Sequence, residues 1–197
     1  GSTLAWKLIS ETRVDDGSVG IYSHKIGNQY WLVGGACNTG GNILRAFFTN
    51  NELQSLTETI EKENMFELNL FGVRDADFFK SNAGGDFGLE VNDAVKKCES
   101  ERETCANDAL FLCKIFSSIA KAEKRCYENA NAMGASVKLK KVYTSGGGAA
   151  NMTWCKMRSS CLSSDNPDST IDVCASEYTE ASYGTALLAK QGFRDKR

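Results

Sequence analysis

The stretch VYTSGGGAANMTW, residues 142–154, joins an apolar, strand-like run to a helix-like run through three consecutive glycines and two alanines. A junction with so few side chains lets main-chain N–H groups approach a bulky or anionic ligand without a Cβ in the way. A helix that starts just beyond the junction adds a partial positive charge at its first turn. A tight turn with nothing bound has the same composition, so this stretch alone leaves both interpretations open.

The sequence on either side of the junction predicts alternating helices and strands. A long helix is expected over 106–132, because its apolar residues recur at helical spacing and Gly134 follows as a C-terminal stop. Strands are expected at 137–143 and 170–175, and helices at 151–162 and 180–191, with a polar loop around Pro167. This order predicts an α/β fold with crossover connections on a sheet.

The first half of the chain reads as a strand, a hairpin and a helix. Residues 4–9 are a short apolar run, and two β-prone runs within 19–35 flank Gly27-Asn28, a dipeptide suited to a two-residue turn. Residues 51–61 carry leucine and isoleucine at helical spacing. Residues 72–104 are mostly polar with little periodicity, so we interpret them as a long loop or partly ordered insertion.

Charge and hydropathy argue against two classes of partner. The chain has 197 residues and a formal net charge of -2, with basic and acidic residues intermixed, so no broad basic field for nucleic acid is expected. No apolar run approaches the roughly 20 residues that span a bilayer. The sequence therefore predicts neither a nucleic-acid nor a membrane partner.

The eight cysteines do not follow a metal-binding or disulfide pattern. None forms a CxxC pair, and His24 is the only histidine, so we expect no metal site and no general-base role for His24. Most of the cysteines fall on apolar stripes, where a free thiol behaves as a small hydrophobe. This usage is typical of a reducing compartment.

Two further glycine-rich stops accompany the junction at Gly146 to Gly148. They are Gly1-Ser2-Thr3 and the run from Gly34 to Gly41, each next to a strand-like segment. Neither the P-loop pattern G-x-x-x-x-G-K-[ST] nor the dinucleotide pattern G-x-G-x-x-G is present. Three such junctions in one α/β chain point to a different nucleotide scaffold.

Four ordered stretches resemble the C-terminal half of the FGGY carbohydrate kinases. They are GSTLAWKLIS, WLVGGACNTGGNILRAFF, KKVYTSGGGAANMTWCKMRSSCL and EASYGTALLAK, and their order and spacing match over most of the chain. The segments GSTL…KLISE, GGACNTGG and NDALFL look most like the cyanobacterial and plant-type D-ribulose kinases, which are xylulokinase-like. The resemblance implies a ribonuclease H-like (actin-like ATPase) lobe, with a mixed sheet covered by helices on both faces. The polar insertion at about 72–104 has no clear match.

The resemblance implies an ATP site carried by seven residues. Ser2 and Thr3 would meet phosphate oxygens, Gly41 would let the nucleotide approach, and Arg45 would lie near it. Gly147 and Gly148 would lie against the adenosine, and Asn151 would offer its amide to the base or ribose. Structural roles compete at two positions, since Arg45 could cap its helix or pair with Glu52, and Asn151 is a natural N-cap. Gly184 and Ala186 are expected to pack rather than bind.

The resemblance also implies what this lobe would lack. A sugar kinase needs an aspartate to accept the hydroxyl proton and Mg²⁺ to offset phosphate charge. In the family that aspartate precedes the Gly-Ser/Thr turn, upstream of this chain, and the sugar pocket belongs to an N-terminal lobe expected to be absent. The acidic residues in predicted loops match no catalytic motif and are not assigned as catalytic: Asp15, Asp16, Asp75 and Asp77.

These observations predict the ATP-binding domain, residues 1–197, of a sugar kinase. The parent reaction would transfer the γ-phosphate of ATP, with Mg²⁺, to a hydroxyl of a ketopentose such as D-ribulose or D-xylulose, and the lobe alone would be inactive. The expected compartment is the cytoplasm, or a plastid if a transit peptide precedes the chain. The alternative is a non-catalytic nucleotide-binding or structural remnant of the same fold. An actin-like or Hsp70-like ATPase would carry its own phosphate motifs, which are not found.

Overall fold

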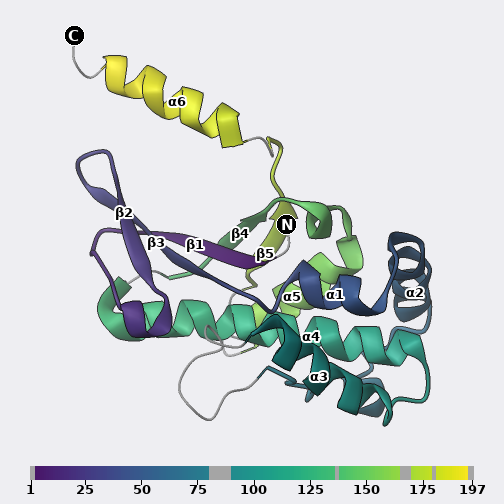
Figure 1. Cartoon of the computed structure of the whole chain (residues 1–197). Coiled ribbons are helices and arrows are strands. Elements are labelled where there is room, and N and C mark those ends of the chain that lie inside the picture. Colours follow the sequence, from purple (N-terminus) through teal and green to yellow (C-terminus); the bar gives the residue numbers. More distant parts are fainter. Residues whose placement is uncertain (1–2, 80–89, 136–137, 165–169, 179–180, 195–197) are drawn as a thin grey trace.

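The computed structural model describes residues 3–79, 90–135, 138–164, 170–178 and 181–194. Ser2, the loop around Pro167 and part of the predicted insertion therefore lie outside the described residues. The regular elements include five strands: β1 (Leu4–Ser10), β2 (Tyr22–Ile26), β3 (Tyr30–Cys37), β4 (Lys141–Thr144) and β5 (Asp172–Ala175). Helices include α1 (Gly41–Phe47), α2 (Asn50–Lys62), α3 (Val91–Arg102), α4 (Asp108–Ala130), α5 (Met152–Ser163) and α6 (Ala181–Arg194). The mixed α/β composition agrees with the predicted class (Figure 1).

The N-terminal strands form an antiparallel sheet in the order β1-β3-β2. The predicted hairpin is confirmed, because β2 pairs with β3 in a register that places Ile26 opposite Tyr30. That register leaves three residues in the loop rather than the expected two, and Gly27 adopts a left-handed φ of 55° there.

The C-terminal strands form a separate parallel pair, β4 with β5, joined through α5. The expectation of a single mixed sheet is therefore wrong for the described residues, where no ladder joins the two sheets. The strand predicted at 137–143 is only four residues long, Lys141–Thr144, and each of its residues pairs with β5. Such a short strand offers little length for further pairing.

Helix α4 runs through the centre of the molecule and contributes to both hydrophobic clusters (Figure 1). Its first half, from Ala109 to Ala120, packs with α1, α2, α3 and the start of α5. Its second half, with Cys126 and Ala130, packs beneath the strands. The predicted helix at 106–132 and its apolar rows are confirmed. Its central position follows from the width of the apolar stripe, which must be buried on several sides. Helix α2 likewise matches the helix predicted at 51–61.

The polar segment at 72–104 is not simply a loop. Helix α3 occupies Val91–Arg102 and buries Ala94 and Cys98, while Phe78 and Phe79 lie in the core before it. The helical spacing of α3 gives only a weak sequence pattern, because its inward side chains are small and few. The loop interpretation is therefore wrong for 91–102, whereas 80–89 lie outside the described residues.

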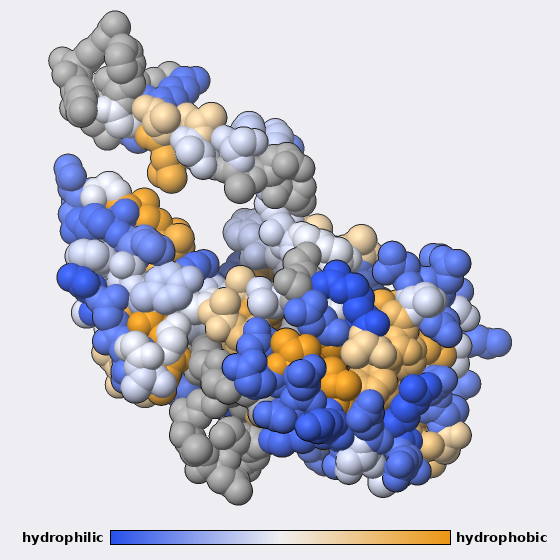
Figure 2. All heavy atoms as spheres, in the orientation of Figure 1, coloured by the Kyte–Doolittle hydropathy of each residue, from blue (hydrophilic) through white to orange (hydrophobic). Residues whose placement is uncertain are grey.

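One face of the antiparallel sheet lies open. Side chains on this face are exposed: Ile9 is 59% exposed, Tyr22 42% and Tyr30 43%. Helix α6 projects away from the body (Figures 1 and 2). Leu187 and Leu188 on this helix are more than half exposed. Helices therefore do not cover both sheet faces in the described structure, contrary to expectation. Gly184 and Ala186 are exposed on α6 and do not pack.

Candidate nucleotide groove

A groove of about 730 Å³ runs between α1, α2 and the start of α5. Five of the seven residues expected to contact nucleotide line it: Gly41, Arg45, Gly147, Gly148 and Asn151. They come from positions more than a hundred residues apart in the chain. The fold thus brings the second and third glycine-rich stretches to one concave surface.

Two of the three glycines of the junction have a reason within the chain to be glycine, and the third does not. Gly146 adopts φ 87° and ψ -173°, a backbone conformation that essentially only glycine tolerates. A Cβ on Gly148 would lie 3.3 Å from Nε1 of Trp154, tighter than ordinary contact. A Cβ on Gly147 would meet nothing within 4 Å. Only at Gly147, therefore, does the chain itself leave the missing side chain unexplained.

The first predicted phosphate contact lies next to the groove. Gly40 precedes α1, and a Cβ there would fall 2.4 Å from the main-chain N of Leu4 and 2.5 Å from the carbonyl carbon of Thr3. Glycine at position 40 therefore permits the close approach of the two segments. This contact sets Thr3, which is exposed, beside Gly41 and the α1 end of the groove. Ser2 lies outside the described residues.

Asn151 is held by two internal hydrogen bonds. Its Oδ1 accepts from the main-chain N of Trp154 at 2.9 Å, so it is the N-cap of α5. Its Nδ2 donates to Oγ1 of Thr57 on α2 at 3.1 Å. The side chain therefore ties two walls of the groove together.

Arg45 is exposed on α1, and its Nη2 donates to Oδ1 of Asn42 at 3.0 Å. The alternative in which Arg45 pairs with Glu52 is wrong, because Glu52 instead forms a capping box with Thr49 at the start of α2. Within the described residues Arg45 makes no ion pair, and it is the only cation among the residues that line the groove there.

Sequence reasoning missed the contribution of α2. One stripe of this helix lines the groove, and its members are Asn50, Leu53, Gln54, Thr57, Glu58 and Glu61. Polar residues at this helical spacing, next to a narrow apolar stripe, were the available signal. The α2 wall is therefore polar, and its two carboxylates lie on the last turns of the helix.

Glu61 is occupied by contacts with α5. Its Oε1 pairs with Nζ of Lys156 at 3.1 Å, and its Oε2 accepts from Oγ1 of Thr153 at 3.2 Å. The hydrogen bonds from Lys156 and Thr153 lower the pKa of this carboxyl from its ordinary value. Together with the bond between Asn151 and Thr57, these contacts clasp α2 to α5.

Two aromatic rings belong to the apolar part of the groove lining. Phe116 of α4 and Trp154 of α5 have ring centroids 4.8 Å apart, and both are largely buried. The guanidinium of Arg158 lies 5.7 Å from the Trp154 ring centroid. The groove thus combines buried aromatic rings with bare backbone at Gly147 and Gly148 and with charged groups.

The unassigned aspartates of the N-terminal half have structural roles. Main-chain and side-chain hydrogen bonds, first from Ser23 and then from Arg13, lower the pKa of Asp15. Asp16 caps the short 3-10 helix Gly17–Val19. His24 contacts Tyr22 edge-on, with ring centroids 5.2 Å apart, and lies outside the groove.

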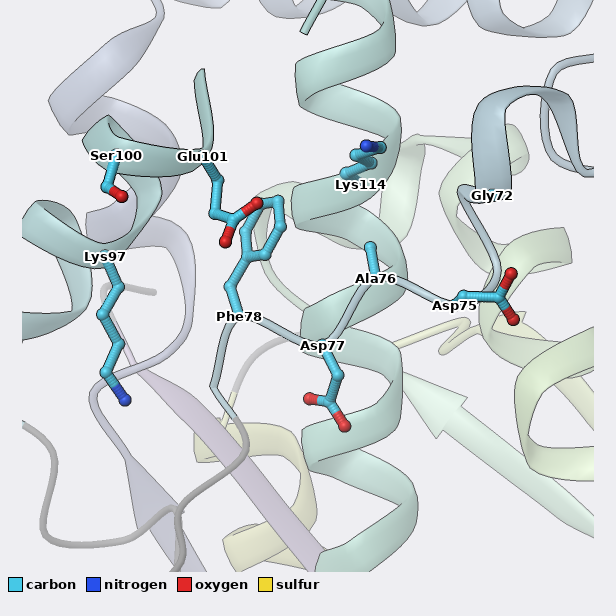
Figure 3. Close-up of a pocket in the computed structure, with 9 residues that line it drawn as sticks. All are labelled: Gly72, Asp75, Ala76, Asp77, Phe78, Lys97, Ser100, Glu101 and Lys114. Atoms are coloured by element: carbon cyan, nitrogen blue, oxygen red, sulfur yellow. The ribbon is translucent and has the colours of Figure 1, made fainter. Parts of the chain in front are cut away.

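A second cavity, of about 450 Å³, is lined by residues of 72–78 together with α3 and α4 (Figure 3). Asp77 borders it but is paired with Arg125, at 2.7 Å and 3.1 Å between nitrogen and oxygen atoms. The other charged groups that line the cavity are mixed in sign, namely Lys97 and Lys114 together with Asp75 and Glu101 (Figure 3). This cavity offers no concentrated charge for an anionic or cationic ligand.

Comparison with known families adds nothing to this geometry, since no family model matches the chain. Among the described residues, His, Cys, Asp and Glu side chains nowhere gather in threes in a way that could hold a metal ion. None of the helices among the same residues has the length and apolarity required to cross a membrane.

Proposed function

We propose that this chain is the ATP-binding lobe of a carbohydrate kinase of the FGGY type, and that ATP occupies the groove between α1, α2 and α5. The observation that carries the proposal is the convergence of Gly41, Arg45, Gly147 and Gly148 on one concave surface. The parent reaction would be transfer of the γ-phosphate to a hydroxyl of a ketopentose such as D-ribulose or D-xylulose.

The shape and charge of the groove favour one orientation of a bound nucleotide along it. The only cation among the described residues that line the groove is Arg45 on α1, and the carboxylates lie on the last turns of α2. Phosphates would therefore lie toward Thr3, Gly41 and Arg45, where like-charge repulsion is least. The nucleoside would lie along the bare backbone of Gly147 and Gly148.

The mixed α/β composition supports the proposal at the level of fold class, since a ribonuclease H-like lobe is an α/β structure. Three antiparallel strands precede the long helix α4, and two parallel strands joined by α5 follow it. The division into two sheets and the open face are the points at which the structure departs from that expectation.

Among the described residues that line the groove, no carboxylate lies beside Arg45, where the phosphates and the ATP-bound Mg²⁺ would be. Glu61 is taken by Lys156 and Thr153, and Glu58 lies on the same far part of α2, away from Arg45. We therefore derive no step through the metal from this chain. Its residues would bind and orient ATP, and the proton acceptor and sugar pocket would come from another lobe.

The second candidate is a nucleotide-binding module of the same fold without catalysis. Gly147, which lacks a packing reason to be glycine, supports retained binding in either case. The two candidates differ in turnover, so a kinase assay of the chain with D-ribulose and D-xylulose, with and without a complementing N-terminal lobe, distinguishes them. Turnover by the chain alone would contradict the assignment of the catalytic base to another lobe.

Calorimetric titration of the chain with ATP tests the site itself. Gly147→Val should fold normally, because its side chain would enter open space, yet should abolish measurable ATP binding. Gly17→Val is the matched control, since that glycine also has nothing within 4 Å and lies outside the groove. Unchanged ATP affinity in the Gly147 variant would remove the nucleotide from this groove.

A further inference from the structure

The groove has an end that carries two carboxylates, and its chemistry follows from those residues. Glu58 and Glu61 face it from the last turns of α2, about two and about three helical turns, respectively, after Asn50 at the start of that helix. A carboxylate accepts hydrogen bonds and repels phosphate, so the ligand portion that lies here must carry hydrogen-bond donors and no negative charge.

Glu58 and Glu61 differ in whether a carboxylate oxygen remains to accept a hydrogen bond from a ligand. Both oxygens of Glu61 are used within the chain, by Lys156 and Thr153. Glu58 accepts one bond, from Nε2 of Gln54 to Oε1 at 3.3 Å, and the described residues give its Oε2 no partner. Glu58 is exposed at the rim, where a ligand can reach it.

We infer that Glu58 accepts hydrogen bonds from the ribose 2′- and 3′-hydroxyl groups, and that the groove therefore selects ribonucleotides over deoxyribonucleotides. This inference rests on the proposed nucleotide function of the groove. The ribose is the part of a nucleotide with two adjacent hydroxyl donors, and a carboxylate that accepts from the ribose 2′-hydroxyl is a recurrent device of dinucleotide sites. The base has the bare backbone of Gly147 and Gly148 to lie against instead.

The clasp between α2 and α5 keeps Glu58 in place. Thr57, the residue before it, accepts from Nδ2 of Asn151, and its own hydroxyl donates to the main-chain O of Leu53 at 2.6 Å. The α2 backbone at Glu58 is thus fixed relative to the glycine junction that precedes α5. A fixed acceptor discriminates better than a mobile one, because less ordering is required on binding.

The test compares ATP with 2′-deoxy-ATP in calorimetric titrations of the wild-type chain, Glu58→Ala and Glu63→Ala. Alanine removes the acceptor and maintains the helix. Glu63 is also exposed, lies at the end of α2 and does not line the groove. Wild type and Glu63→Ala should bind 2′-deoxy-ATP roughly 3- to 10-fold more weakly than ATP, as expected for one lost hydrogen bond. Glu58→Ala should bind the two nucleotides equally.

Each other outcome overturns a defined part of the argument. If wild type binds ATP and 2′-deoxy-ATP equally, the hydroxyl contact is wrong and the nucleotide site stands. If Glu58→Ala keeps the preference for ATP, the preference belongs to another residue. If wild type binds neither nucleotide, the proposed function fails, and the inference fails with it.

Discussion

Glu123 and Arg158 form a buried bidentate ion pair at the boundary between the two hydrophobic clusters. The Nε–Oε2 distance is 2.7 Å and the Nη2–Oε1 distance is 2.6 Å. On α4, Glu123 lies between Ala120, which belongs to one cluster, and Cys126, which belongs to the other. On α5, Arg158 directly follows Met157, which belongs to the same cluster as Ala120. Burial would lower the pKa of Arg158, but hydrogen bonds and the charge of Glu123 outweigh it and raise the pKa.

Removal of one partner of this pair should destabilise the fold strongly. Glu123→Gln leaves the guanidinium of Arg158 buried without a counter-charge, which costs about 3–5 kcal/mol in comparable pairs. Urea unfolding followed by circular dichroism measures the change in the free energy of unfolding. The double variant Glu123→Leu/Arg158→Met should recover most of it, because no buried charge then lacks a partner. An unchanged free energy of unfolding in the single variant Glu123→Gln would contradict the buried placement of the pair.

Gly40→Ala should destabilise the contact between β1 and α1. The new Cβ would overlap the main chain of Thr3 and Leu4, and neither can yield as a flexible side chain could. We expect a loss of roughly 1–3 kcal/mol in the free energy of unfolding. Gly17→Ala, which meets nothing within 4 Å, provides the control, and equal melting temperatures for the two variants would refute the close approach.

The eight cysteines should separate into reactive and protected groups. All eight are free thiols, and five are buried: Cys37, Cys98, Cys113, Cys126 and Cys155. Burial raises the pKa of Cys98 and of Cys113 to about 12 and that of Cys161 to about 11, which suppresses the reactive thiolate. With a thiol-specific alkylating reagent at pH 7, Cys105 and Cys174 should therefore react first.

Peptide mass spectrometry of the alkylated chain identifies the order of reaction. In urea all eight thiols should react at similar rates, which shows that protection comes from the fold. Early labelling of Cys113 in the folded chain would contradict the central position of α4.

Removal of residues 177–197 should leave the body of the protein almost as stable as before. The side chains described on α6 are exposed, so deletion of the helix takes little from the two clusters. We expect the free energy of unfolding to change by less than about 1 kcal/mol, the range of ordinary surface changes. A loss of several kcal/mol would mean that α6 covers the open sheet face in solution.

The sequence predicts the elements whose signal is strong and local. The wide apolar stripe of α4 and the hairpin around Gly27 both appear where they were expected, because periodicity and turn residues act within a few positions. Helix α3 was missed because Ala94 and Cys98 make too small a stripe to stand out.

Only the glycine-rich side of the candidate site could be predicted from the sequence. Glycines at positions 41, 147 and 148 stand out in the sequence, and the fold brings them together. The polar wall of α2 could not be foreseen, because it becomes a wall only when Thr57 meets Asn151, 94 positions along the chain. Strand pairing failed for a similar reason, since nothing local decides whether β4 has one neighbour or two.

The course of α4 through both clusters has a thermodynamic consequence. Both hydrophobic clusters would lose packing contacts if α4 unfolded. The cluster beside the groove and the cluster beneath the strands therefore cannot unfold independently. Slow amide hydrogen exchange should therefore extend along α4 from Phe111 to Tyr127 with a single opening energy. A ligand that tightens the groove would then slow exchange in β1 and β3 as well, far from any atom it touches.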